Sequence, residues 1–366
     1  MSAPLKYPFL DLLSDNAPYL DELEQAALRV IRSGRYIGGE EVSTFEAELA
    51  ACVGVKHCVG VSNGLDAIRL IFRAYIELGK LREGDEVITA SNNYIAGILA
   101  ATDCGLRPVF VEPDPMTLNL DPARVAASVS GRTRAIMPVD LYGRVCAVPN
   151  EFKRDFIIVE DACQSIGARN AGRTGHAAAF SFYPTKNVGA IGDAGAVTTD
   201  DAELAEVVRA LRNYGSLKQY ENIYKGLNCR LDPIQAAFLR VKLPHIDEEN
   251  AMRREKAAIY DQEINNPLIA LPQMPSEPTE HVWHQYIIRV AGGRRDEFRA
   301  FLADRGVGTG IHYPTPIHRQ PCYREYASSE FPIAERLCAE VVSLPISRAT
   351  SPDDVREISR IINQFC

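Results

Sequence analysis

The chain has 366 residues, of which 46% are hydrophobic and 24% are charged, as is typical of a globular protein with a sizeable core. Its formal net charge is −8, so binding to nucleic acid or to an anionic membrane is not expected, and no segment reaches the length of a membrane span. The nine cysteines form no Cys-x-x-Cys pair, and the start MSAPLKYPFLDLL lacks a basic region followed by a long apolar run, which together predict a reduced, cytoplasmic protein.

From about residue 40 to 245, short β-branched runs alternate with helical patterns. HCVGV precedes GLDAIRLIFRAYIEL, and DEVITA precedes YIAGILAA. Further strands are predicted at RPVFVEP, RAIMPVDLYG, DFIIVEDA, AAAFSFY and GAVTTD. This alternation predicts an α/β fold with a mainly parallel sheet that helices cover on both faces. Ligands of such sheets bind at the carboxyl ends of the strands.

The pattern changes after LPHIDEENAMRREKAAIYDQEI, which we predict to be a connecting helix. A Pro-rich surface connection, PLIALPQMPSEPTE, follows it. The remaining predicted elements are HVWHQYIIRV, a helix near 294–305, GVGTGIHY, VVSLPI and a terminal helix. We therefore predict a large α/β domain over residues 1–245 and a smaller α+β domain over residues 246–366.

Two polar sites follow predicted strands. DFIIVEDACQSIGA carries Asp161 at the end of a strand and Gln164 shortly after it, although an isolated Asp here can also cap a helix. SNGLDA opens a helix whose free backbone N–H groups lie near Gly64 and Leu65. Such a helix end suits a phosphate, although Ser-Asn-Gly is also a common turn composition.

Lys186 lies between a predicted buried strand and a loop with three glycines, in AFSFYPTKNVGAIGDAGAVTTD. A P-loop places its glycines before the lysine, and a dinucleotide fingerprint places them where a strand turns into a helix, so neither motif fits. An ordinary surface lysine is the other interpretation. The position at the ligand-binding edge favours a functional amine.

A lysine, an acid at a strand end and a helix N-terminus together match the needs of pyridoxal 5′-phosphate (PLP). This cofactor requires an amine for its Schiff base, a carboxylate that keeps its pyridine nitrogen protonated, and a site for its phosphate. The sequence therefore predicts a PLP enzyme.

Six motifs in this order resemble the nucleotide-sugar aminotransferases of the DegT/DnrJ/EryC1/StrS family: SNGLDA, NNYIAG, EDACQSIGA, FSFYPTKNVGAIGDAGAV, LRNYGS and GLNCRLDPIQAAFLRVKL. The resemblance covers nearly the whole chain and implies fold type I, the aspartate-aminotransferase-like fold, and a homodimer with shared active sites. It implies that Lys186 forms the Schiff base and then moves the proton, and that Asp161 binds the pyridine nitrogen. The remaining implied cofactor contacts are Gln164 to the phenolic oxygen, Tyr94 stacking on the ring, Ser181 and the backbone at Gly64 and Leu65 to the phosphate, and Asn228 reaching that phosphate from the neighbouring subunit.

The resemblance also implies the substrates. Many relatives have Ser-Gly-Thr where this chain has Asn63-Gly64-Leu65, so a threonine hydroxyl near the phosphate is missing. The Asn-Gly-Leu-Asp version, with Tyr183 before Pro-Thr-Lys, is similar to the branch that acts on dTDP-linked 3-keto-6-deoxyhexoses in surface-polysaccharide or natural-product synthesis. L-Glutamate would be the amino donor. Amination at C4 instead of C3 remains an alternative.

The segment GTGIHYPTPIH supplies candidate substrate residues, His312, Tyr313 and His318, because similar segments of the family border the sugar nucleotide. A strand followed by a Pro-rich turn is the structural alternative. Tyr183 is a candidate sugar contact or a buried aromatic. The two histidines of this segment lack a third ligand nearby, so no metal site is predicted.

His281 and His284 are three residues apart in HVWHQYIIRV, which on a strand would direct them to opposite faces. We interpret both as packing residues.

Two other classes of function compete with this interpretation. A non-catalytic nucleotide-sugar-binding or regulatory protein of this fold would be favoured by loss of Lys186 or Asp161, and both are present. A nicotinamide-dependent sugar oxidoreductase would need fingerprint glycines that the chain lacks.

Overall fold

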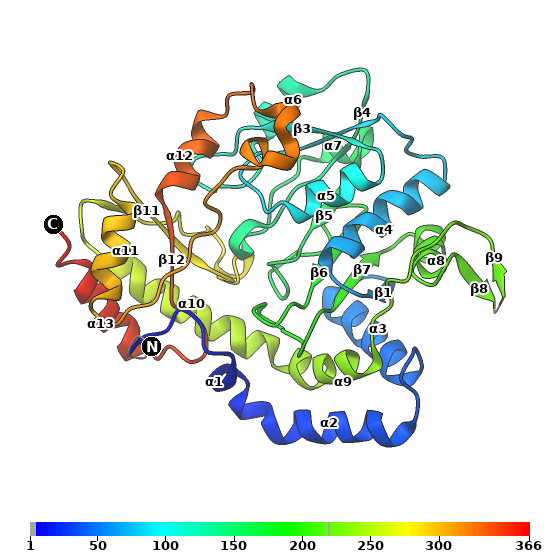
Figure 1. The fold of residues 1–366 in the computed structure, drawn as a ribbon, viewed down its shortest axis with the longest axis horizontal. Helices are drawn as coiled ribbons and strands as arrows, with labels where there is room; N and C mark the ends of the chain where they lie inside the picture. Colours follow the sequence, from blue (N-terminus) through cyan, green and yellow to red (C-terminus); the bar gives the residue numbers. More distant parts are fainter. Residues whose placement is uncertain (1–4, 219) are drawn as a thin grey trace.

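The computed structural model describes residues 5–218 and 220–366, and its centre is a seven-stranded sheet (Figure 1). The strand order is β1-β7-β6-β5-β4-β2-β3. The strands are β1 (His57–Val61), β2 (Glu86–Ala90), β3 (Arg107–Val111), β4 (Thr133–Ile136), β5 (Ile157–Asp161), β6 (Ala177–Ser181) and β7 (Gly195–Thr199). Only β7 runs against its neighbours, so the predicted mainly parallel α/β sheet is confirmed.

Helices pack on both faces of this sheet because strand side chains alternate between the faces. Val59 and Val61 share one core with α4 (Gly64–Glu77), α5 (Ala96–Asp103) and α8 (Ala202–Leu211). Cys58 points the other way, into the core formed with α3 (Glu40–Val53) and α9 (Pro233–Lys242). The shorter helices α6 (Pro122–Ser128) and α7 (Asn150–Asp155) lie against β2, β3 and β5.

A second, antiparallel sheet lies in the C-terminal part of the chain. Its order is β10-β11-β12, with β10 (Ile269–Ala270), β11 (Tyr286–Val290) and β12 (Val341–Leu344). The elements around it are α10 (Ile246–Glu263), α11 (Arg295–Ala303), α12 (Pro332–Glu340) and α13 (Pro352–Ile362). A separate hydrophobic core fills this part of the molecule, as expected for a unit of its own.

The proposed boundary between residues 245 and 246 falls at the start of α10. Tyr7, however, belongs to the C-terminal core, and its backbone N–H donates to the carbonyl of Gly306 at 2.8 Å. We propose that the smaller domain recruits this N-terminal segment. Helices α1 (Leu12–Asn16) and α2 (Leu20–Ser33) then lead into the large domain, from which the hairpin β8 (Ser216–Lys218) and β9 (Glu221–Asn222) projects (Figure 1).

Three local predictions in the C-terminal part are wrong. β11 begins only at Tyr286, so His281 and His284 precede the strand and do not lie on its opposite faces. GVGTGIHY forms single bridges, such as Gly310 with Ser343, instead of a strand. The Pro-rich connection contains β10, which was not predicted because two residues are too short for a pattern.

In the described part of the chain, we find no helix with the length and apolarity that crossing a membrane requires.

Candidate active site

The candidate cofactor residues come from neighbouring strand ends. Strands β1, β2, β4, β5 and β6 run in one direction, so their carboxyl ends meet at one edge of the sheet. Asp161 ends β5, Ser181 ends β6, and Gly64 follows β1 by three residues. A Cβ placed on Gly64 would lie 2.8 Å from the Cβ of Ser181, which shows how closely these two segments approach. The structure thus brings together groups that are far apart in the sequence.

The start of α4 forms a polar corner at this edge. The side chain of Asn63 caps the helix, and its Oδ1 accepts the backbone N–H of Asp66 at 2.8 Å. The N–H groups of Gly64 and Leu65 have no partner within the helix and point out of its positive end. The hydroxyl of Ser181 lies beside them, so the corner can bind a phosphate.

Gly64→Ala is expected to close this corner. The added methyl group would lie 2.7 Å from the Sγ of Cys163 and 2.8 Å from the Cβ of Ser181, closer than atoms in contact can lie. We expect PLP to bind at least about 10-fold more weakly. The added methyl group would displace the phosphate by roughly 1 Å, which removes much of the energy of a charged hydrogen bond to the backbone N–H groups. Fluorescence titration of the apoprotein with PLP measures this. Gly131→Ala is the matched control, because nothing lies within 4 Å of its added Cβ; equal affinities of the two variants would contradict the assignment.

Asp161 is a buried acid without a cationic partner. Its Oδ1 accepts the backbone N–H of Cys163 at 3.1 Å, and within the described residues no Lys or Arg pairs with it at salt-bridge distance. Burial raises the pKa of Asp161, while the hydrogen bond to Cys163 and the charge of Lys186 lower it. No helix begins between Asp161 and β6, so it does not cap one. A carboxyl group in this position suits a ligand that brings a positive charge.

Lys186 lies in the turn that follows β6. Its backbone N–H donates to the carbonyl of Tyr183 at 2.8 Å, and the residue is partly buried. Burial lowers the pKa of the Lys186 ammonium, against the opposing influence of Cys163 and Asp161. The amine is therefore more readily deprotonated than that of a surface lysine.

An aromatic pair borders the same edge. The rings of Tyr94 and Tyr313 stack with centroids 4.9 Å apart and planes inclined by 30°. The Nε2 of Gln164 lies 3.4 Å from the hydroxyl of Tyr313, while its Oε1 accepts the backbone N–H of Tyr142 at 2.7 Å. Because Tyr142 fixes the oxygen, the amide N–H₂ of Gln164 is directed to the side where a ligand can accept from it.

Histidines line the other side of the lysine. Nδ1 of His312 lies 2.7 Å from the hydroxyl of Ser343, and burial, with a smaller effect of Lys186, lowers the pKa of His312 to about 4. His284 contacts the Oδ1 of Asn187 at 3.2 Å, and burial together with Lys186 holds its pKa well below the usual range. Both rings are therefore neutral at physiological pH. The sequence did not predict that His284 would lie next to the segment of Lys186, because its distance along the chain gives no signal.

Three candidates lie apart from this group. His318 is 0% exposed, and its Nε2 bonds to the carboxylate of Glu335 at 2.9 Å, so the structure gives it a structural contact. Tyr183 is 51% exposed and is not the buried aromatic of the alternative interpretation. Asn228 is exposed, and among the described residues its side chain makes no hydrogen bond to the other candidates.

The geometry fits PLP. A corner of N–H groups, a buried carboxyl group that has no ion-pair partner among the described residues, and a lysine with a lowered pKa lie at one sheet edge. These are the kinds of group that would hold the phosphate, the pyridine nitrogen and the aldehyde of that molecule. The described residues contain no group of three or more His, Cys, Asp or Glu side chains suited to a metal ion.

Known proteins are similar to this chain in sequence and fold over most of their length. The chain is 48% identical to the "dTDP-3-amino-3,6-dideoxy-alpha-D-galactopyranose transaminase" of Aneurinibacillus thermoaerophilus, over 98% of this chain and 99% of the relative. A crystal structure of DesV from S. venezuelae in complex with a ketimine intermediate superposes with a TM-score of 0.92 at 42% identity, covering 99% of this chain and 98% of DesV. A structure of ntda from Bacillus subtilis with bound cofactor pmp gives a TM-score of 0.89 at 28% identity, covering 99% and 86% of the two chains.

The family model for the DegT/DnrJ/EryC1/StrS aminotransferase family matches residues 19–363. With the structural neighbours, this match identifies the cofactor as PLP and the fold as that of the PLP-dependent aminotransferases. The predicted cofactor and enzyme class are confirmed. The chain belongs to the DegT/DnrJ/EryC1/StrS aminotransferase family.

Proposed function

We propose that this aminotransferase moves the amino group of L-glutamate to C3 of a dTDP-linked 3-keto-6-deoxyhexose, giving a dTDP-amino-dideoxyhexose and 2-oxoglutarate. The observation that carries the proposal is a lysine of lowered pKa beside a buried acid at the cofactor edge, in a chain 48% identical to a relative named for a dTDP-3-amino sugar. That name supports C3 over C4, and the lysine and the acid support a catalyst over a silent binding protein.

PLP, when bound, supplies an electron sink for the electron pair left behind as the donor loses its α-proton. The Nζ of Lys186 takes that proton, since burial favours its neutral form. Asp161 would hold the proton of the pyridine nitrogen, because a buried carboxylate is stabilised by a cation beside it. Lys186 performs the reverse transfer when the keto sugar receives the amino group.

Other residues position the ring and exclude water. The stacked pair Tyr94 and Tyr313 lies at one side of the sheet edge. Gln164, whose side-chain oxygen accepts from Tyr142, would donate to the phenolic oxygen of PLP. Ser181 and the N–H groups at Gly64 and Leu65 would hold the phosphate. We propose that Tyr183 and His312 contact the sugar, since one is exposed and the other is a neutral ring beside Lys186. His318 is fully buried, so it would contact the sugar only in a conformation that exposes its side chain.

The regiochemistry is tested by incubating the holoenzyme with L-glutamate and a panel of dTDP-linked 3-keto and 4-keto 6-deoxyhexoses. We expect one amino sugar whose NMR spectrum places the nitrogen at C3, with 2-oxoglutarate formed in equal amount. Nitrogen at C4 would favour the competing 4-aminotransferase. Absence of any transamination across the panel would contradict the proposed function.

We propose a homodimer in which Asn228 completes the partner's phosphate site. Its side chain is exposed and, among the described residues, makes no hydrogen bond to the other candidates, which supports this assignment. Mixing inactive Lys186→Ala chains with inactive Asn228→Asp chains is expected to restore part of the activity, because one of the two sites in a heterodimer is then intact. Tagged heterodimers, purified and assayed, provide the measurement; a proven heterodimer without activity would exclude shared sites.

A further inference from the structure

Arg253 is a cation buried without a carboxylate partner. It lies on α10, is only 8% exposed, and its recorded hydrogen bonds are two long contacts from Nη1, at 3.3 and 3.5 Å, to the carbonyls of Trp283 and His284. Its Nε is buried and has no hydrogen-bond partner in the part of the chain that the structure describes. Among the described residues, no Asp or Glu lies within salt-bridge distance of it. A guanidinium presents five donors, so most of this group's capacity is unused.

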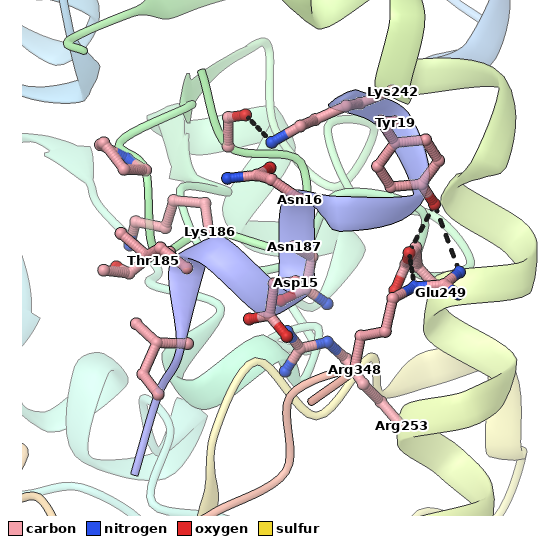
Figure 2. A pocket seen from close by; sticks show the side chains of 14 residues that line it. Asp15, Asn16, Tyr19, Thr185, Lys186, Asn187, Lys242, Glu249, Arg253 and Arg348 are labelled. Carbon is pink, nitrogen blue, oxygen red and sulfur yellow. Dashed lines mark hydrogen bonds and ion pairs between the residues drawn. The ribbon is translucent and has the colours of Figure 1, made fainter. Parts of the chain in front are cut away.

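The acids around it are already engaged. Glu249 binds the Nε of Arg348 at 2.6 Å and the hydroxyl of Tyr19 at 2.6 Å, and Asp15 accepts the backbone N–H of Ala349 at 2.8 Å. Figure 2 shows these side chains gathered around the short helix α1, with Arg253 on α10 below it and Lys186 on the segment beside it. A buried guanidinium that leaves its donors unpaired is costly, unless an anion binds there.

Two small cavities meet at Arg253. One, of about 40 Å³, is lined by Lys186, Asn187 and Arg253, and the other, of about 90 Å³, by Arg253, His284 and His312. Both are also bordered by Leu10 and Thr185. One water molecule needs roughly 10–15 Å³ of such space. The two cavities are therefore large enough for a group of a few atoms but too small for a nucleoside diphosphate.

Other cations add to the positive character of this region. Lys242 and Lys256 donate to the carbonyls of Gly189 and Ser347, both at 2.7 Å, and neither has a carboxylate partner among the described residues. Burial lowers the pKa of both His284 and His312, so these rings add no charge at neutral pH.

Lys186 lines the smaller cavity, which Asp15 and Glu249 also border, whereas the described lining of the larger cavity has Arg253 and no Asp or Glu. A carboxylate therefore fits the larger cavity, next to the one that Lys186 lines.

We infer that Arg253 is the carboxylate-binding residue for the amino donor. The inference rests on the proposed function, since the donor must place its amino group at Lys186, and a small amino acid there brings its carboxylate to the adjoining cavity. Arg253 binds one carboxylate by charge-assisted hydrogen bonds through Nε and its free terminal nitrogens. The bulky sugar nucleotide does not use this group.

The test separates the two half-reactions. Arg253→Gln is expected to raise the KM for L-glutamate in the first half-reaction, followed by the absorbance change of the PLP form, by about 10- to 100-fold, the loss of one charged hydrogen-bonding partner. The KM for the dTDP-keto sugar with the enzyme preloaded as pyridoxamine phosphate should stay within about twofold. Arg254→Gln is the matched control, because this neighbour lines neither cavity.

A second readout needs no turnover. Succinate, a dicarboxylate without an amino group, should bind the wild-type and Arg254→Gln holoenzymes by calorimetry and should bind Arg253→Gln at least about 10-fold more weakly. If Arg253→Gln does not fold, as judged by its melting curve, Arg253→Lys takes its place, since it keeps the charge but loses the fork of donors. We expect it to weaken succinate binding as well.

The outcomes are distinguishable. A weakening shared by L-glutamate and L-glutamine assigns Arg253 to the α-carboxylate, whereas a weakening for L-glutamate alone assigns it to the side-chain carboxylate; both support the inference. Unchanged donor KM and succinate affinity, or a rise confined to the sugar nucleotide, would overturn it. If the wild-type holoenzyme transaminates no donor at all, the proposed function fails instead.

Discussion

Lys186→Ala is expected to lower the turnover number on the order of 10³-fold or more. The variant loses both the amine that attaches the cofactor and the group that moves the proton. Of the described residues, the one other lysine that lines the cavity beside Lys186 is Lys242, whose Nζ donates to the carbonyl of Gly189. The rate with L-glutamate and the dTDP-keto sugar gives the measurement. Pyridoxamine phosphate should still bind, because the polar corner at the start of α4 and Asp161 are unchanged in this variant.

Two controls sharpen this result. Lys186→Arg keeps a cation but holds its proton at every accessible pH, so it should be as inactive as the alanine variant. Lys56→Ala removes an exposed lysine and should retain full activity. Activity of Lys186→Arg near that of the wild type would mean that the residue supplies charge alone.

Asp161→Asn is expected to lower the turnover number on the order of 10²–10³-fold, the usual effect of removing one electrostatic contact from a reacting centre. An amide of the same shape fills the same space but cannot stabilise a proton on the pyridine nitrogen by charge. Steady-state rates and the absorbance spectrum of the bound cofactor report the change. Asp155→Asn, at the opposite end of β5 and exposed, should behave as the wild type; a similar loss in both variants would point to a stability effect.

Asp161→Glu adds a test of position. It keeps the charge but moves the carboxylate by one methylene in a buried site, where small displacements are costly. We expect activity between that of the asparagine variant and that of the wild type. A glutamate variant less active than the asparagine variant would show that shape, not charge, dominates at this position.

The large domain and its cofactor edge were predictable for a physical reason. Parallel strands place their carboxyl ends at one edge, so Asp161 after DFIIV, Ser181 in AFS and the helix start at Gly64 had to come together once the strands were recognised. The Asn63 cap also follows directly from the local sequence.

Contacts between segments that are distant in the sequence gave weaker signals. Tyr94 and Tyr313 stack, although nothing in the sequence of either segment indicates that they pair. The backbone N–H of Tyr142 orients Gln164, and any residue except proline at position 142 could donate the same hydrogen bond. Such contacts depend on tertiary packing, which periodicity does not report. The sequence around His318 likewise did not indicate that its side chain is buried.

The position of Arg253 in the helical pattern of α10 could have indicated its burial from the sequence. Residues Ile246, Asn250, Arg253, Ala257 and Tyr260 repeat at the helical spacing and all are buried. A charged residue within an otherwise inward-facing stripe is expensive, so its presence indicates a partner or a ligand. The high charge of the surrounding helix obscured this pattern.

The most direct test is borohydride reduction of the PLP-loaded protein followed by peptide mass mapping. We predict a visible absorbance band that disappears on reduction and a phosphopyridoxyl group on Lys186, in the peptide that also contains Tyr183. The same treatment of Lys186→Ala should label no lysine stoichiometrically. A stoichiometric label on another lysine of the wild-type protein, or none at all, would contradict the assignment of Lys186 and with it the proposed chemistry of the site.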